Sequence, residues 1–247
     1  MTMRKPLVAA NWKMNGNAAL AQDMLQTLAG HALPELDVLI CPPATLLQPL
    51  AHSAHCLLGA QNLSQFSDGA YTGELSAALL SEAGVRYVLV GHSERRTLFG
   101  ESDAVVLAKM EQAIAHGLIP VFCLGENLQQ RQQEKTSEVL AKQLAAVYAS
   151  HPEFIGKSVV AYEPVWAIGT GEAASPEQAQ QAHAFIRQQL ANYDAEAADS
   201  VRILYGGSVK AANAEELFRQ ADIDGGLVGG ASLNADEFLK ICQSAKG

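Results

Sequence analysis

The chain has 247 residues, of which 49% are hydrophobic and 17% are charged, and its formal net charge is −9. The hydrophobic share excludes a disordered chain, and the acidic balance argues against nucleic-acid binding, which needs a basic face. An anionic small molecule is not excluded, because a local site can be positive on a negative protein.

The four cysteines, at positions 41, 56, 123 and 242, contain no C-x-x-C pair and therefore predict neither a disulfide framework nor a zinc motif. Free thiols indicate a reducing compartment. The apolar run at residues 7–10 is too short for a signal peptide, and no stretch reaches the ~18 apolar residues of a membrane span. We expect a cytoplasmic globular protein without a membrane partner.

Eight short apolar runs recur along the chain and are typical of strands buried on both faces. They cover residues 7–10, 38–41, 57–60, 87–90, 119–123, 159–162, 201–205 and 227–228. The segments between them carry apolar residues every four positions, as helices do. Ser175, Asn213 and Asn234, each followed three residues later by Gln or Glu, predict three helix starts.

The predicted strand ends recur at a mean interval of about 31 residues, the size of one βα unit. Eight such units without a linker match a closed, eight-stranded parallel β/α barrel, which typically has about 250 residues. We therefore predict one α/β barrel domain over residues 1–247. A doubly wound sheet is the alternative, although it usually has fewer strands and a clear switch point.

In such a barrel, chemistry belongs at the carboxyl ends of the strands. Lys13, His92 and Glu163 follow three different predicted strands, and Gly-Gly pairs at 206–207 and 229–230 follow the last two. Glycines let an anion approach backbone N–H groups, and Lys13 adds positive charge. Glu163 is a candidate general base and His92 a candidate hydrogen-bond donor. This set suits proton abstraction next to a carbonyl of a phosphorylated substrate.

Other polar residues are expected to be structural. They are Glu94 as a partner of Lys13, Lys109 on a helix outside the site, His52 and His55 on a surface helix, Cys123 packed in the barrel, and Asp222 and Asp224 at the end opposite the chemistry. No strand end offers clustered Asp, His or Cys ligands, so we expect no metal and no cofactor.

Five motifs together resemble the triosephosphate isomerase family over the whole chain. They are Asn-Trp-Lys-Met-Asn at 11–15, Gly-His-Ser-Glu-Arg-Arg at 91–96, the run at 161–171 that begins Ala-Tyr-Glu-Pro-Val-Trp, Tyr-Gly-Gly-Ser at 205–208 and Val-Gly-Gly-Ala-Ser at 228–232. The resemblance implies a β/α barrel that interconverts dihydroxyacetone phosphate and D-glyceraldehyde 3-phosphate through an enediolate, in glycolysis and gluconeogenesis.

The resemblance also implies residue roles. Glu163 would move the proton, and neutral His92 would polarise and protonate the enediolate oxygens. Lys13 and Asn11 would bind substrate, with Ser93 and Glu94 as supporting residues. Backbone N–H groups of four residues would hold the phosphate: Gly169, Ser208, Gly229 and Gly230. Residues 164–174 would form a lid, whose end Glu172-Ala173-Ala174 departs from the family's more usual Lys.

Residues 64–74, from Ser64 to Glu74, resemble the family's long third loop, which reaches into a neighbouring subunit. A homodimer is therefore implied, with Thr72 near the partner's active site. Spacing alone predicts only a long polar loop.

Two other functions remain open on the residues themselves. A Schiff-base aldolase would use Lys13 as its nucleophile, which needs a desolvated amine. Asn11 and Glu94 beside Lys13 would instead keep the amine charged. A non-catalytic barrel that binds phosphorylated metabolites would not need Glu163 and His92 together.

Overall fold

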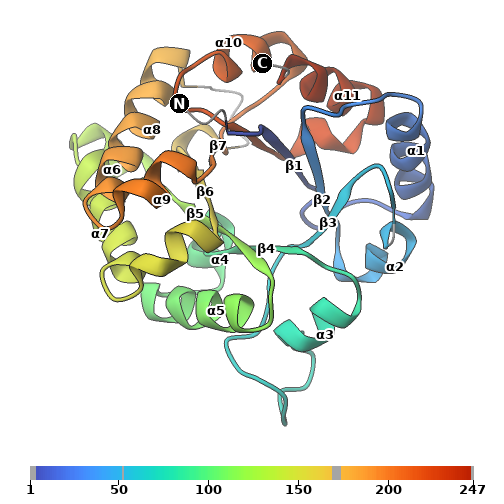
Figure 1. The fold of residues 1–247 in the computed structure, drawn as a ribbon, viewed down its shortest axis with the longest axis horizontal. Coiled ribbons are helices and arrows are strands. Elements are labelled where there is room, and N and C mark those ends of the chain that lie inside the picture. The colour runs from blue at the N-terminus through green and yellow to red at the C-terminus, as the bar shows by residue number, and fades with distance from the viewer. Residues whose placement is uncertain (1–3, 52, 169–173, 246–247) are drawn as a thin grey trace.

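A computed structural model describes residues 4–51, 53–168 and 174–245. Within these residues, eight parallel strands close into a barrel, each paired with the next in the chain and β8 paired with β1 (Figure 1). The strands are β1 (Leu7–Asn11), β2 (Asp37–Cys41), β3 (Leu57–Ala60), β4 (Tyr87–Val90), β5 (Ile119–Leu124), β6 (Val159–Tyr162), β7 (Ile203–Tyr205) and β8 (Gly225–Val228). The closed barrel confirms the predicted fold class and excludes the doubly wound sheet.

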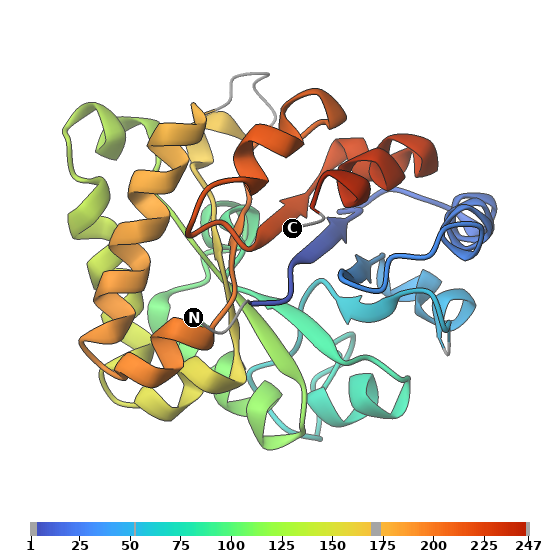
Figure 2. The same ribbon diagram turned by 45° about the horizontal axis from the view of Figure 1, so that its top comes forward.

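Helices surround the strands on the outside of the barrel (Figure 2). The described residues form the α-helices α1 (Ala18–Ala29), α2 (Leu47–Leu50), α3 (Ala77–Glu82), α4 (Ser93–Leu98), α5 (Asp103–Ala115), α6 (Leu128–Gln132), α7 (Thr136–Tyr148), α8 (Pro176–Ala191), α9 (Ala195–Ser200), α10 (Ala211–Phe218) and α11 (Ala235–Ser244). Short 3₁₀ helices are η1 (Ala44–Leu46), η2 (Pro152–Lys157), η3 (Val165–Ala167) and η4 (Gly230–Leu233). Among these helices, none is both long and apolar enough to cross a membrane.

The predicted strands are all present, and β3, β4 and β6 have the predicted bounds. β7 begins later than predicted, at Ile203, because the Val201 N–H still donates to a carbonyl of α9 at 2.8 Å. β8 begins earlier than predicted, at Gly225. A Cβ there would lie 2.0 Å from the Leu7 carbonyl oxygen, and φ is +129°, so only glycine lets β8 approach β1 this closely.

Two of the three predicted helix starts are confirmed. Ser175 caps α8 with the expected reciprocal capping box, and Asn234 caps α11. The prediction for Asn213 is wrong, because α10 begins at Ala211 and Lys210 is its N-cap. Asn213 is already the third helical residue, and its side chain reaches back to the Lys210 N–H. A polar residue three positions before a carboxylate therefore does not identify the N-cap of a helix by itself, because a polar residue that precedes it can be the N-cap instead.

Alternate strand residues face the barrel interior and the helices. A separate apolar cluster contains only strand side chains: Leu7, Ala9, Leu39, Cys41, Tyr87, Leu89, Val121, Cys123, Val159, Ala161, Leu204 and Leu227. This cluster fills the barrel and includes Cys123, as expected. By the same alternation, Asn11 after Ala9 and Glu163 after Ala161 point into the barrel mouth.

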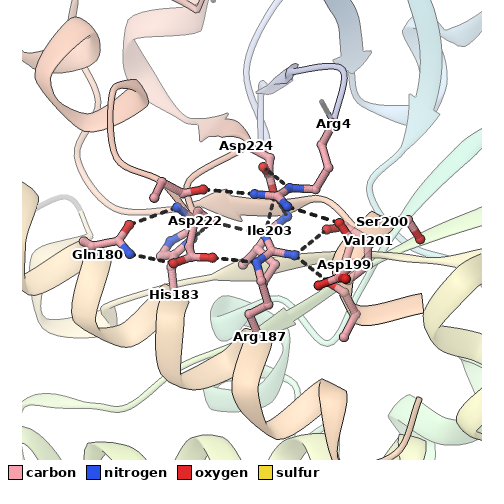
Figure 3. A network of polar contacts seen from close by, with 12 residues as sticks. Arg4, Gln180, His183, Arg187, Asp199, Ser200, Val201, Ile203, Asp222 and Asp224 are labelled. Atoms are coloured by element: carbon pink, nitrogen blue, oxygen red, sulfur yellow. Dashed lines mark hydrogen bonds and ion pairs between the residues drawn. The ribbon is translucent and has the colours of Figure 1, made fainter. Parts of the chain in front are cut away.

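An ion-pair network closes the opposite end of the barrel (Figure 3). Arg187 of α8 donates to Asp222 at 2.7 Å and to Asp224 at 2.8 Å, and Arg4 donates to Asp224 at 2.6 Å. Asp224 also accepts the N–H of Ile203 at 2.8 Å, which ties the network to β7. The two aspartates therefore hold the N-terminal segment, α8 and β7 together, in agreement with the structural role expected for them.

His183 of α8 is fully buried beside this network. Its Nδ1 lies 3.1 Å from the Asp222 carbonyl oxygen, and its ring meets the Tyr162 ring edge to face at 5.8 Å. Nε2 has no hydrogen-bond partner in the described part of the chain. Burial lowers the pKa of His183 from 6.5 to about 4, because a cation here would lack solvent.

We expect His183 to make the fold sensitive to acid. Between pH 6.5 and about 4 the unfolded state binds more protons at this site than the folded state, so stability falls as the pH falls. This shift corresponds to a loss of about 2 kcal/mol between pH 7 and pH 5. Urea unfolding of His183→Gln at both pH values should show that much less loss than the unsubstituted chain. The exposed His31→Gln control should retain the full loss, and an equal loss in His183→Gln would contradict the assignment.

The surface helix expected at His55 is wrong, whereas the helix expected at Lys109 is confirmed. Lys109 lies on α5 as expected, but it is only 4% exposed and donates to Glu101 at 2.5 Å and to Asn62 at 2.6 Å. His55 is exposed in a bend before β3 and is not on a helix, while His52 lies outside the described residues. In the described ranges, no group of three His, Cys, Asp or Glu side chains is arranged to hold a metal ion.

Candidate active site

A cavity of about 400 Å³ opens at the carboxyl ends of the strands. It brings together most of the residues singled out from the sequence: Asn11, Lys13, His92, Glu163, Ser208, Gly229 and Gly230. These residues come from β1, β4, β6, β7 and β8 or from the loops that follow them. In the sequence these residues extend from position 11 to position 230, so only closure of the barrel makes them neighbours.

Glu163 is 1% exposed and lies between two glycines that leave room for it. A Cβ at Gly206 would lie 2.9 Å from its Cγ, and a Cβ at Gly125 would lie 1.7 Å from its carbonyl oxygen. Oε1 is 2.9 Å from Nε2 of His92, and Oε2 accepts the N–H of Ser93 at 2.9 Å. Both carboxylate oxygens are therefore occupied in this resting arrangement.

The environment keeps the Glu163 carboxylate ionised. Burial raises the pKa of Glu163, but His92, the Ser93 N–H and the more distant charge of Lys13 lower it by a larger amount. The net pKa lies below the usual carboxyl range. A buried carboxylate that stays charged at neutral pH has the protonation state of a base.

His92 lies two residues beyond the end of β4 and is the N-cap of α4. Its Nδ1 accepts the N–H of Glu94 at 3.2 Å, so in the neutral ring the proton is on Nε2, facing Glu163. Burial lowers the pKa of His92, while the Glu163 carboxylate raises it and sets the net direction upward. The Glu94 carboxylate, 3.7 Å from Nδ1, also raises the pKa of His92, and the Lys13 ammonium lowers it.

Lys13 adopts a left-handed backbone conformation with φ of +52°, which costs a non-glycine residue about 1 kcal/mol or more. Two side chains hold it: its N–H donates to Asn11 at 3.0 Å, and its carbonyl accepts from Gln61 at 2.9 Å. Gln61 also donates to the Cys41 carbonyl at 2.9 Å. The ammonium lies 2.5 Å from Glu94, the partner expected from the sequence. Sequence reasoning missed the role of Gln61, since an amide after a strand carries no specific signal.

The loops after β7 and β8 are held by side chains that the sequence analysis did not assign to the site. Asn213 donates to the Ser208 carbonyl at 3.1 Å, which steadies the Gly-Gly-Ser turn. Ser232 donates to the Gly229 carbonyl at 2.6 Å. A Cβ at Gly229 would lie 3.5 Å from Cε of Lys13, so the second Gly-Gly turn borders the cation directly.

The family model described as triosephosphate isomerase matches residues 6–245. The chain belongs to this family. Curated relatives named triosephosphate isomerase cover nearly all of it. The protein of Thiobacillus denitrificans is 53% identical over 247 residues, covering 98% of this chain and 99% of the relative. Those of Alcanivorax borkumensis and Alkalilimnicola ehrlichii are 52% and 51% identical, covering 98% and 99% of this chain and 99% and 100% of the relatives.

Membership of the triosephosphate isomerase family confirms the resemblance, but some assigned positions are not among the described residues that line this cavity. Gly169 and the lid residues Glu172 and Ala173 lie outside the described residues. Thr72 is exposed in the segment between β3 and α3 and does not line this cavity. The described end of the lid is anchored, because the N–H of Ala174 donates to the Tyr205 hydroxyl at 3.3 Å.

Proposed function

We propose that this chain interconverts dihydroxyacetone phosphate and D-glyceraldehyde 3-phosphate, as a cytoplasmic enzyme of glycolysis and gluconeogenesis whose residues 1–247 act as one catalytic domain. The observation that carries the assignment is the pairing of a buried, ionised Glu163 with the Nε2–H of His92, 2.9 Å apart, beside the Lys13 ammonium. A base, a neutral donor and a cation are the groups that a proton transfer next to a carbonyl requires.

In the proposed reaction, the Glu163 carboxylate first exchanges its contact with His92 for the substrate carbon next to the carbonyl. It removes a proton from that carbon, and the C–H electron pair forms the carbon–carbon double bond of an enediolate. The freed Nε2–H of His92 donates to the developing oxyanion and moves a proton between the two oxygens. Return of the proton from Glu163 to the neighbouring carbon gives the isomer without any external reactant.

Lys13 and the two Gly-Gly turns would bind the phosphate end of the substrate. The ammonium of Lys13, whose side chain is 28% exposed, would offset part of the dianion charge. Backbone N–H groups of Ser208, Gly229 and Gly230 border the same cavity, and glycines leave them open to an anion. Gly169 is part of this proposal on family resemblance alone.

The Schiff-base alternative is disfavoured by the ion pair at Lys13. An amine 2.5 Å from the Glu94 carboxylate is held as an ammonium and lacks the electron pair needed to attack a carbonyl. Borohydride added with substrate should therefore leave no adduct on the chain, as judged by its mass. A trapped adduct at Lys13 would favour the aldolase.

The proposed function is tested by a coupled assay in both directions with purified chain. We expect rapid interconversion of the two triose phosphates, unchanged after exhaustive chelation, because the proposed steps use only side chains and backbone. Binding of either triose phosphate without turnover would favour the non-catalytic barrel. Activity that returns only with added Mg²⁺ or Zn²⁺ would overturn the proposed chemistry.

We also propose that two copies assemble through residues 64–74. This segment projects away from the barrel beyond α3 (Figure 1), and its Phe66 and Tyr71 rings stack at 4.4 Å while each stays 43% exposed. A second cavity of about 320 Å³, bordered by Lys13 and the 95% exposed Met14, adjoins the active site. An exposed aromatic projection and an open, partly apolar cavity on the same chain support an interface between copies.

Replacing residues 65–70 with a short Gly/Ser turn should give monomers of low activity. In the proposed dimer, the same segment of the second copy fills the second cavity beside Lys13, and the short turn would leave this cavity empty. Sedimentation velocity measures the assembly, and the coupled assay measures turnover. A single exposed change in the same segment, Asp68→Asn, serves as the control that should remain dimeric. A dimeric loop variant with normal turnover would contradict both the interface and the position of Thr72.

A further inference from the structure

The backbone of Gly125, just beyond the end of β5, lacks a strand partner on one side. The carbonyls before and after it, of Leu124 and Glu126, accept the N–H groups of Glu163 and Val165 at 2.8 and 3.1 Å. In a parallel ladder the intervening residue turns its own N–H and carbonyl to the other side. β4 has already ended there at Val90, so both groups need another partner.

Gln143 of α7 supplies that partner. Its Oε1 accepts the Gly125 N–H at 2.9 Å, and its Nε2 lies 3.4 Å from the Gly125 carbonyl oxygen. One side-chain amide thus takes the place of a strand residue, matching the donor and the acceptor of a single residue. α7 packs against β5, which brings the amide to the strand end.

Gly125 in turn supports the backbone of Glu163. Its Cα lies so close to the Glu163 peptide that a Cβ would approach the carbonyl oxygen to 1.7 Å. Gln143 and Glu163 also border the same cavity of about 170 Å³, which is separate from the cavity of about 400 Å³ at the candidate active site. A shift of Gly125 would therefore be passed directly to the backbone that carries the carboxylate.

We propose that Gln143 is a positioning residue for Glu163, acting through the backbone of Gly125, an inference that rests on the proposed function of Glu163. The Gln143 amide holds Gly125 against the backbone of Glu163. This contact fixes the position of the Glu163 carboxylate at the carboxyl ends of the strands. Within the described residues, the hydrogen bonds of Gln143 go to Gly125 and not to the Gly-Gly turns after β7 and β8, so we expect it to affect the proton transfer and leave substrate binding alone.

The test compares Gln143→Met, which keeps the length of the side chain and removes both hydrogen bonds, with Lys142→Met at the exposed neighbouring position on α7. We expect Gln143→Met to lower kcat about tenfold, since a misplaced base loses rate steeply with distance. KM and the inhibition constant of inorganic phosphate should stay within about twofold of the unsubstituted chain. Lys142→Met should change none of the three.

A second variant, Gln143→Glu, restores the acceptor for the Gly125 N–H and should recover most of kcat at a pH where both carboxylates are ionised. Unchanged kcat in Gln143→Met, or a Gln143→Glu variant no better than Gln143→Met, would overturn the proposal. Equal losses in kcat and phosphate affinity would also overturn it, because they indicate general damage. If the unsubstituted chain is inactive, or Glu163→Gln is fully active, the proposed function fails instead.

Discussion

Glu163→Gln is expected to lower kcat by about 10³-fold, because loss of a general base typically costs between 10² and 10⁴. The amide retains the size of the side chain and its single oxygen can accept one of the two hydrogen bonds, from the Ser93 N–H or from His92, but it cannot accept a proton from carbon. Since Glu163 is 1% exposed between Gly125 and Gly206, the substitution leaves the fold and the cavity intact. Steady-state kinetics should therefore show a large change in kcat and a small one in KM.

A matched pair of variants sharpens this test. Glu163→Asp keeps the base but withdraws it by about 1 Å, and its kcat should fall about 10²-fold. Glu138→Gln, at an exposed position of α7, removes the same charge from the chain and should leave kcat unchanged. Retention of more than a tenth of kcat in Glu163→Gln would remove Glu163 from the reaction.

Lys13→Met is expected to lower kcat/KM by about 10³-fold, as loss of a preorganised charge in a shielded site does. The chain carries a net charge of −9, so a local cation is needed to hold a phosphorylated dianion at all. Met keeps the aliphatic stem against Gly229, and Glu94, whose side chain is 41% exposed, stays hydrated without its partner. The loss should appear in both KM and kcat, and the inhibition constant of inorganic phosphate should rise in parallel.

The control for this variant is Lys142→Met, which removes an exposed ammonium from α7. Lys109 is unsuitable for that purpose, because its ammonium is buried against the Glu101 carboxylate. Removing it would take one of the two cations, Lys109 and Arg95, from the buried Glu101 carboxylate and destabilise the fold. Equal kcat/KM for Lys13→Met and Lys142→Met would exclude Lys13 from the site.

Local patterns predict the strands because strands buried on both faces need continuous apolar runs. The apolar runs predicted for β3, β4 and β6 have the same bounds as the strands in the structure, because polar residues closely flank these short segments. Backbone packing changes the bounds of other strands. β8 begins at Gly225 although glycine disfavours strands, because only glycine fits beside the backbone of Leu7. The helix start at Asn213 is wrong for a related reason, since a side chain can cap from inside the helix as well as before it.

The sequence by itself determined the barrel, the family and the residue types at the carboxyl ends of the strands, because each follows from local order along the chain. Only the tertiary structure decided how those residues are held. Gln61 donates to the carbonyl of Lys13, Asn213 donates to that of Ser208, and Gln143 binds the N–H and the carbonyl of Gly125. Each is an amide paired with a backbone group whose strand or turn partner is missing. Such a backbone group is left without a strand or turn partner only after the barrel closes, so no pattern in the sequence predicts which amide will bind it.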